Sequence, residues 1–393
     1  MRSCVFATAR VGTLVGFVVL AACSASIPAD ESQNRATQGN SQGTFGSSSG
    51  ASSSGAAAAP CIPDPKNAEI PDNQCDDDGD GKVDNVPGCD TGLSAGGDGE
   101  AFAKAMGLCN KPDGANKDYG LVSATFTKGY GSASAGNAAQ HGILPKFGSA
   151  VKPREGGTLG ILSTGYAREF DDAAGASTSF KVGSVKGGGA GAVPPGYPKA
   201  AEGCRQAKTT YDVIDLKLTI KAPQNATGFM FDFDFYSAEW PDFLCSEYND
   251  GFVAYLNAKG FNNGAPENIS FDAKKNPVSV NNGFFDRCTP NVQTGCMGDK
   301  TTTSVCPGGP GELAGTGFGI TDTFCGSASS VSGGATGWLT SSAPVQPGET
   351  FTLEFLIWNT GDSNLDSSVL LDHFRWIGGA PVQVGTTRPD QVK

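Results

Sequence analysis

Polar and apolar residues alternate in many short stretches of this chain, and this pattern limits its fold more than any other feature. In residues 228–237, GFMFDFDFYS, a phenylalanine occupies every second position from Phe229 to Phe235. In an extended strand these rings all point to one face, while Asp232 and Asp234 point to the other. The pattern therefore predicts a strand with one face buried.

The same alternation recurs along the chain and predicts an all-β protein. Strands are expected at residues 121–127, 158–165, 212–223, 228–237, 251–257, 276–282, 350–360 and 367–378. Glycine makes up 56 of 393 residues, about 14% and roughly twice the usual share, which favours turns between short strands. Only residues 101–109 form a plausible helix, whereas a parallel α/β fold needs helices between its strands. We therefore expect an antiparallel β-sandwich of jelly-roll type with long, disulfide-pinned loops.

The N-terminus carries an export signal. Arginines precede an apolar run at residues 11–22, which is too short for a stable membrane span but fits the apolar segment of a signal peptide. The run ends in Leu-Ala-Ala-Cys, which resembles the bacterial lipoprotein signal. We predict residues 1–22 as the lipoprotein signal peptide and Cys23 as the lipid attachment site. The chain is then an outer membrane lipoprotein that faces the periplasm or the cell surface. An ordinary secretory signal with an unrelated cysteine is the alternative.

Composition separates a tether from the folded part and narrows the partners. Residues 23–60 are rich in Ser, Ala and Gly and bury too little apolar surface to fold, so we expect a disordered tether. The formal net charge of −12 excludes binding of nucleic acid through a basic face. The membrane, reached through the lipid, and a surface glycan or protein ligand remain as partners.

The cysteines indicate disulfides. Of 12 cysteines, Cys4 leaves with the signal and Cys23 carries the lipid, and the remaining ten form an even set in an exported chain. Proximity favours a Cys75–Cys89 pair, and two further pairs among Cys288, Cys296, Cys306 and Cys325. Structural zinc is the alternative, but the chain has no CxxC motif and only two histidines.

Residues 61–95 form a Cys-rich and Asp-rich segment that fits a calcium loop. Asp76, Asp78 and Asp80 occupy its first three ligand positions, the Lys82 carbonyl the seventh and Asp84 the ninth. Position twelve is proline, where an EF-hand has a bidentate glutamate, so a helix-loop-helix sensor is excluded. The segment resembles the short Asp-rich calcium repeats of extracellular bacterial proteins, and Asp90 is a further candidate ligand. We predict a structural calcium ion here; a solvated acidic linker is the alternative.

A second group of carboxylates is a candidate metal or ligand site. Period-two counting places Asp372 on the same face as Phe374 and Trp376, where a carboxylate needs a cation or several donors. One hypothesis is a second divalent ion held by some of Glu239, Asp250, Asp362, Asp366 and Asp372. The alternatives are pairing with Arg287 or Arg375, or hydrogen bonds from loop amides to Asp372.

The loop at residues 239–250 also carries aromatic residues. Trp240, Phe243 and Tyr248 fit either a flat platform on which a sugar stacks or a small core within the loop itself. Packing is the preferred interpretation, because Cys245 is expected to anchor the loop.

Residues 97–378 contain long motifs in a fixed order. They include AQHGILPKFG, TLGILSTG, FMFDFDFYSAEWPDFLCSEYNDGFVAYL, NPVSVNNGFF and TGWLTSSAPVQPGETFTLEFLIWNTGDSNLDSSVLLDHFRW. Together these motifs resemble the choice-of-anchor L domain, in the lipoprotein form seen in myxobacteria and related bacteria. That family occurs on surface and secreted proteins, so the resemblance implies surface display or adhesion. It implies no catalytic residue.

The residues themselves give little support to an enzyme. His141 and His373 lie in no nucleophile or metal motif, and a glycosidase pair such as Glu239 and Glu247 depends on a distance that sequence does not fix. We expect a non-catalytic binding or adhesion module, followed by a C-terminal tail at residues 379–393. A secreted carbohydrate-active hydrolase with two carboxylates, or a purely structural envelope component, are the alternatives.

Overall fold

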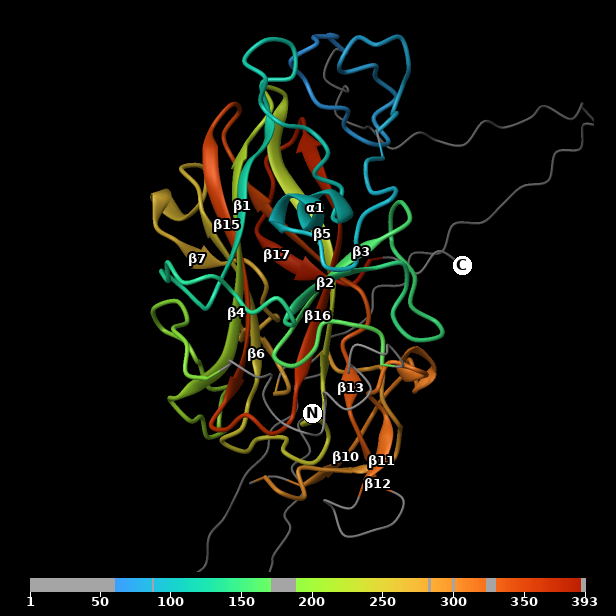
Figure 1. Cartoon of the computed structure of the whole chain (residues 1–393), viewed down its shortest axis with the longest axis vertical. Coiled ribbons are helices and arrows are strands. Elements are labelled where there is room, and N and C mark those ends of the chain that lie inside the picture. The colour runs from blue at the N-terminus through green and yellow to red at the C-terminus, as the bar shows by residue number, and fades with distance from the viewer. Residues whose placement is uncertain are drawn as a thin grey trace, which may run out of the picture. The chain divides into compact units, whose positions relative to one another are not determined.

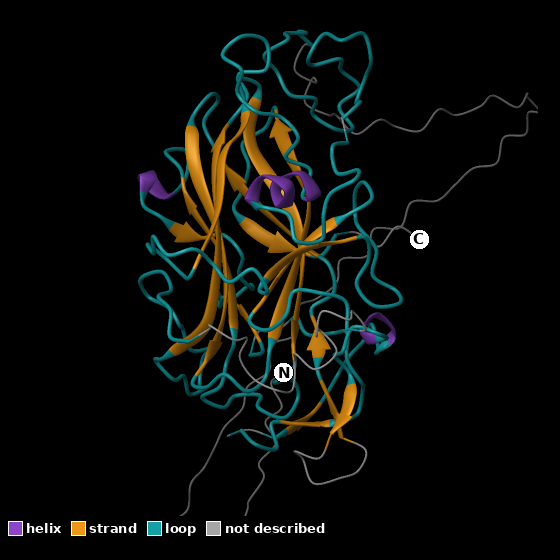
Figure 2. Ribbon diagram, viewed as in Figure 1, coloured by secondary structure: helices purple, strands orange, loops and turns teal. Residues whose placement is uncertain are grey.

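The computed structural model describes residues 61–86, 88–170, 189–281, 284–298, 301–322 and 330–389. The predicted signal peptide, Cys23 and the tether lie outside these residues. Two antiparallel sheets pack face to face (Figure 1), and strands and loops make up nearly all of the fold (Figure 2). The expected all-β sandwich is confirmed. The described part of the chain has no helix of the length and apolarity that crossing a bilayer requires.

The first sheet has six strands. Their order is β1-β4-β15-β6-β7, with β8 also paired to β6. The bounds are Gly120–Thr127 for β1, Thr210–Lys221 for β4, Thr350–Thr360 for β15, Gly251–Asn257 for β6, Glu267–Asn268 for β7 and Val278–Ser279 for β8.

The second sheet has seven strands. Their order is β17-β14-β5-β16-β3-β2, with β13 also paired to β5. The bounds are Gly385–Thr387 for β17, Leu339–Pro344 for β14, Ala226–Ser237 for β5, Ser367–Gly378 for β16, Leu159–Ser163 for β3, His141–Leu144 for β2 and Gly334–Ala335 for β13. Part of the segment expected as a C-terminal tail therefore forms β17.

Smaller elements lie outside the two sheets. Helix α1 covers Gly99–Ala105, and Asp98 caps it by accepting a hydrogen bond from the Ala101 amide at 2.9 Å. The remaining elements are β9 (Gln293–Thr294), β10 (Thr302–Thr303), β11 (Ile320–Asp322), β12 (Ser330–Ser332) and the 3-10 helices η2 (Asn262–Gly264) and η3 (Gly311–Leu313).

The predicted phenylalanine face of β5 forms the centre of the core between the sheets. Phe229 stacks on Phe351 of β15 with ring centroids 5.3 Å apart, and Phe231 meets Phe355 edge to face at 5.0 Å. These rings are fully buried. Burying one such side chain contributes about 1.5–3 kcal/mol, so this aromatic layer is a main source of stability.

The opposite face of β5 is buried as well, which the alternation did not predict. Asp232 is 1% exposed and Asp234 is fully buried. Arg154, Thr340 and His373 contact Asp232, and a second apolar cluster that includes Phe147 and Tyr236 lies on this face of the sheet. Hydroxyl groups satisfy Asp234: Tyr236 Oη donates to it at 3.0 Å.

A bulge in strand β16 changes which residues face the core: odd-numbered residues face it before the bulge and even-numbered residues face it afterwards. Leu371 points into the core between the sheets, whereas Asp372 lies opposite Asp232 on the outer face. The register then shifts around His373, whose φ is 55°, and Phe374 points into the core again. The prediction that Asp372 shares a face with Phe374 is wrong, because period-two counting fails across a bulge.

Disulfides fasten the loops, but the predicted pairing at the acidic segment is wrong. The bonds within the described residues are Cys61–Cys75, Cys89–Cys109, Cys204–Cys245 and Cys288–Cys306. Each end of the acidic loop is thus bonded to a neighbouring segment, and the loop is not closed by a Cys75–Cys89 bond. Cys288–Cys306 is one of the pairs expected within its group. Cys296 is also disulfide-bonded, and Cys325 lies outside the described residues.

Candidate metal sites

The Asp-rich segment packs on one end of the sandwich. Ala68 and Ile70 join the core between the sheets. Asn225, in the loop between β4 and β5, exchanges two hydrogen bonds with the Ala68 backbone, at 3.0 and 2.8 Å. Asp90 accepts hydrogen bonds from the Gly157 and Thr158 amides at 2.6 and 2.7 Å, so it anchors its segment to the loop before β3. Its role as a further calcium ligand stays a prediction.

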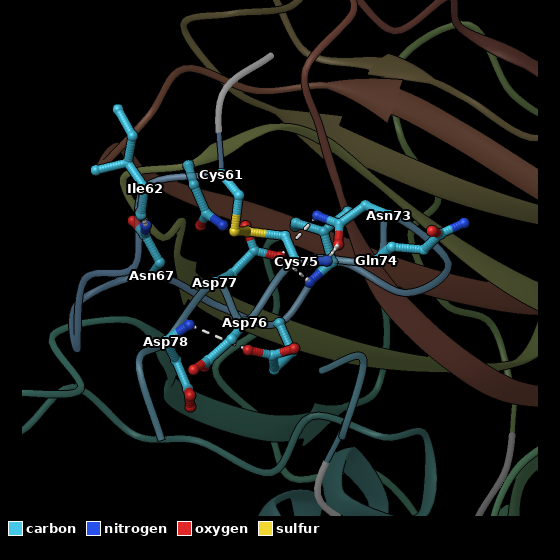
Figure 3. The surroundings of a disulfide bond; sticks show 12 residues. Cys61, Ile62, Asn67, Asn73, Gln74, Cys75, Asp76, Asp77 and Asp78 are labelled. Carbon is cyan, nitrogen blue, oxygen red and sulfur yellow. Dashed lines mark hydrogen bonds between the residues drawn. A yellow bond between two sulfur atoms is a disulfide. The ribbon is translucent and has the colours of Figure 1, made fainter. Parts of the chain in front are cut away.

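Three carboxylates of this segment converge. Glu69, Asp76 and Asp78 each offer an oxygen, and these oxygens lie within 4.8 Å of one another. Figure 3 shows Asp76 and Asp78 directly after the Cys61–Cys75 disulfide. Two oxygens on opposite sides of a calcium ion are about 4.8 Å apart, because each lies about 2.4 Å from the ion. The spacing of this acidic triad therefore fits a calcium site.

The hydrogen bonds of the acidic triad leave oxygens free for a cation. Glu69 accepts from the Asp78 amide at 3.0 Å, but its Oε2 has no partner although the residue is only 7% exposed. Asp76 Oδ1 is likewise buried without a partner. Burial raises the pKa of Glu69, and the charges of Asp78 and Asp77 raise it further. Among the described residues, the cation paired with the triad is Lys117, on Asp78.

The other predicted ligands of the loop have different contacts. Asp80 accepts hydrogen bonds from the Lys82 amide at 2.8 Å and from Asn85 at 3.0 Å, and Asp84 accepts from the amide of Asn73 at 3.1 Å. These bonds shape the turn. Glu69 was missed because it precedes the motif; its only sequence signal is an acidic residue between two cysteines that turn out to be bonded.

A small pocket opens beside the acidic triad. Its volume is about 80 Å³, and its lining includes Glu69, Asp78, Lys117, Tyr119 and Trp376. The pocket gives an ion and its water molecules room next to the triad, although it is too small for a sugar ring.

The second predicted site is only partly assembled. Asp250 accepts hydrogen bonds from the Thr360 amide at 3.0 Å and from Ser367 Oγ at 2.7 Å, and its own amide donates to Glu239 at 3.3 Å. The charge of Asp250 acts on both Glu239 and Asp366, and Asp362 acts on Glu239 and Asp250. The four carboxylates from the loops are therefore close enough to influence one another, although among the described residues no three of their oxygens lie within 4.8 Å of one another.

Asp372 does not belong to this second group. It lies six residues along an extended strand from Asp366, about 20 Å away at the usual rise. Its carboxylate accepts from the amides of Arg154 at 2.5 Å and Glu155 at 3.4 Å. The structure thus agrees with the loop-amide alternative and contradicts a shared ion.

Asp212 joins the second group instead, and sequence reasoning missed it. It lies in a β-bulge of β4, where the register against β15 shifts and its φ is 51°. Its charge acts on both Asp250 and Asp366. Burial raises the pKa of Asp212 to about 6 and that of Asp250 to about 8. No local signal in DVIDLKL marks such a bulge.

The aromatic residues of the loop pack inward. Trp240 is 4% exposed and stacks on Phe285 with ring centroids 6.4 Å apart, while Phe243 meets Tyr248 edge to face at 5.7 Å. With Trp240 in the core, these rings form no flat exposed platform. The packing alternative is therefore the correct one.

Comparisons with known proteins place the sandwich in a family. The family described as the Choice-of-anchor L domain matches residues 160–374, more than half of the 393-residue chain. The chain belongs to the Choice-of-anchor L domain family. The matched residues of this Choice-of-anchor L domain run from β3 to β16. No curated protein matches the chain.

Two solved structures show weak likeness to this Choice-of-anchor L protein. TmCBM61 in complex with β-1,4-galactotriose is 7% identical, with 66% of this chain and 90% of that chain covered and a TM-score of 0.24. A β-glucosidase from Kluyveromyces marxianus in complex with glucose is 12% identical, with 74% and 25% covered and a TM-score of 0.17. At these TM-scores the likenesses decide neither fold nor ligand.

Proposed function

We propose that this chain is a lipid-anchored, non-catalytic binding module of the bacterial outer membrane, facing the periplasm or the cell surface. In this proposal Cys23 carries the lipid, residues 23–60 form the tether, and the Choice-of-anchor L domain presents a surface to a glycan or protein ligand. A calcium ion in the Asp-rich segment stiffens the junction between tether and domain.

The acidic triad carries this proposal. Glu69 Oε2 and Asp76 Oδ1 are buried without partners, and the nearby Asp78 oxygen completes a set of hard oxygen donors. Such donors suit calcium, which would supply the positive charge that Lys117 alone does not. Because Ala68 and Ile70 flank Glu69 and join the core, ordering the triad also fixes the first described segment on the sandwich.

Burial of the loop carboxylates supports a non-catalytic role. A hydrolase that uses two carboxylates must bring both to the bond it cleaves. Glu239 is 3% exposed and hydrogen-bonded to the Asp250 amide, whereas Glu247 is exposed. A polymer at the surface therefore reaches only one of the two glutamates that we considered as a pair.

Calcium binding is tested on the full chain by thermal unfolding with calcium and with a chelator. Calcium at 100 times its Kd stabilises a folded protein by about 2.7 kcal/mol. Glu69→Gln should remove the part of this response that comes from the acidic triad. The matched control is Asp72→Asn, which removes one charge from an exposed position of the same segment and should keep the full response. An unchanged response in Glu69→Gln would refute calcium binding at the triad.

The anchor and the binding role need separate tests. Radiolabelled palmitate should enter the wild type but not Cys23→Ala; equal labelling of both would refute lipidation at Cys23. A glycan array and a cell-attachment assay should show binding, while a panel of polysaccharides should remain uncleaved. Hydrolysis that a single carboxylate-to-amide change abolishes without unfolding would instead establish an enzyme.

A further inference from the structure

Strands of both sheets end at a common group of buried polar residues, which we name the end cluster: Asp212, Glu239, Asp250, Asn359 and Asp366. Asp212 and Asn359 lie in β4 and β15 of the first sheet, and Asp250 directly precedes β6. Glu239 follows β5 and Asp366 precedes β16, both in the second sheet. Each member of the end cluster is at most 3% exposed.

The end cluster is remote from the acidic triad. Asn225 is hydrogen-bonded to the Asp-rich segment and lies just beyond the C-terminal end of β4. Asp212 lies near the N-terminal end of the same strand. A strand of 12 residues spans about 40 Å. The two groups therefore lie at opposite ends of the sandwich, with the end cluster beside the end of β5 that pairs with β13 (Figure 1).

We propose that the end cluster binds a divalent cation, with calcium as the expected ion, and that this ion ties the two sheets together. The first reason is uncompensated charge. Four carboxylates lie together, and the charged groups that act most strongly on them are one another and Asp362. Within the described residues, none of the ion pairs joins a lysine, arginine or histidine to a member of the end cluster.

The second reason is a set of polar atoms without partners. Asp212 Oδ2, Asp366 Oδ2 and both amide atoms of Asn359 are buried and make no well-formed hydrogen bond. Each of these three residues is 1% exposed, and the Asn359 amide faces the Asp366 carboxyl. Asn359 carries no charge. Its unpaired amide oxygen therefore points to a bound ligand separately from the argument about uncompensated charge.

Protons are the alternative to a cation here, because burial raises the pKa of these carboxyl groups. A proton neutralises only the one carboxyl group that binds it. A cation, in contrast, is bound directly by such oxygens. Gly165 packs directly against the Asp366 carboxyl group, since a Cβ at this position would lie 2.0 Å from Oδ2, so a side chain there would displace this carboxyl.

The expected coordination mixes carboxylates with neutral oxygens. In the described residues the acidic triad is the only group in which three acidic oxygens lie within 4.8 Å of one another, so an ion in the end cluster contacts carboxylate oxygens in pairs. Calcium takes six to eight oxygen ligands from carboxylates, amides, carbonyls and water. The Asn359 amide oxygen and water molecules therefore complete the set.

The test measures calcium binding and stability of the full chain in two backgrounds. In Glu69→Gln, which disables the acidic triad, calcium should still raise the unfolding temperature, and Asp366→Asn added to it should remove this response. Loss of a ligand should weaken binding by at least the 10–100-fold that loss of an outer-shell partner costs. Glu267→Gln, at an exposed position of β7, is the control and should change neither the calcium affinity nor the rise in unfolding temperature that calcium causes.

A second measurement separates binding from a folding defect. Without calcium, Asp366→Asn should be at least as stable as the wild type, because it removes one of several like charges. With calcium, the wild type should be more stable than Asp366→Asn. The proposal is overturned if Glu69→Gln has no calcium response, or if Asp366→Asn in that background keeps it. Failure of calcium binding at the acidic triad would appear separately, as an unchanged response of the Glu69→Gln single variant.

Discussion

His141 should make the stability of this protein depend on pH. It lies on β2, is 8% exposed, and its ring stacks on Phe126 with centroids 3.7 Å apart and planes at 9°. Burial and, to a smaller extent, the nearby charge of Arg168 together lower the pKa of His141 from 6.5 to about 4. Folding therefore favours the neutral ring.

The sign and size of the effect follow from proton linkage. Between pH 6.5 and about 4 the unfolded chain binds a proton at His141 and the folded chain does not, so acid favours unfolding. Between pH 7 and pH 5 this residue should cost about 2 kcal/mol of unfolding free energy, and about 3 kcal/mol once the pH falls below about 4.

Urea unfolding at several pH values tests this prediction. His141→Phe keeps an aromatic ring against Phe126 but does not titrate, so the gap between wild type and variant should change by about 2 kcal/mol from pH 7 to pH 5. Carboxylates that titrate in the same range cancel in this difference. His141→Gln, which lacks the ring, should show the same change at a lower overall stability. Parallel curves for the wild type and both variants would refute the reasoning.

Three further predictions concern the core, the loops and the second sheet. Phe231→Ala should cost about 3–5 kcal/mol and Val122→Ala, at a 50% exposed position, less than about 0.5 kcal/mol in urea unfolding; equal costs would contradict the assigned core. Replacing both Cys204 and Cys245, which are 41 residues apart, with alanine should cost about 4 kcal/mol in the same assay, and a loss under about 1 kcal/mol would mean that the loop stays closed without the bond. Burial raises the pKa of Asp372 to about 7, so the folded state binds this proton more tightly than the unfolded state. The wild type should therefore gain stability relative to Asp372→Asn as the pH falls from about 8 to 5, and a pH-independent difference in melting temperature would disprove this.

Much of the fold was predictable because strand formation here follows local alternation. The expected strands at 251–257, 350–360 and 367–378 have the observed bounds of β6, β15 and β16. Short strands escaped prediction: β2 has four residues and β14 reads LTSSAP, so neither shows a run of apolar residues at every second position. These strands form because a longer neighbour offers them a hydrogen-bonding edge.

The candidate sites were less predictable, because convergence of residues depends on the whole fold. The gathering of Glu239, Asp250 and Asp366 was predicted, since each lies next to the end of a strand. Asp212 lies in the end cluster because a bulge in β4 turns its side chain toward the other members. Glu69 lies in the acidic triad because its segment folds back on the loop that contains Asp76 and Asp78. Asp372 does not lie with the predicted group, because it is in the middle of the extended strand β16 and therefore far from the loops at the strand's start.

The sequence by itself determined that this chain forms an antiparallel sandwich, since period-two alternation decides which side chains face the core. It also indicated disulfides and clustered acidic residues in the loops, because the cysteines and the runs of carboxylates are visible between the predicted strands. Only the tertiary structure decided which cysteines bond, which face of β5 is covered and which carboxylates meet. Those outcomes depend on contacts between residues far apart in the chain and on single-residue bulges, and neither leaves a repeating pattern in the sequence.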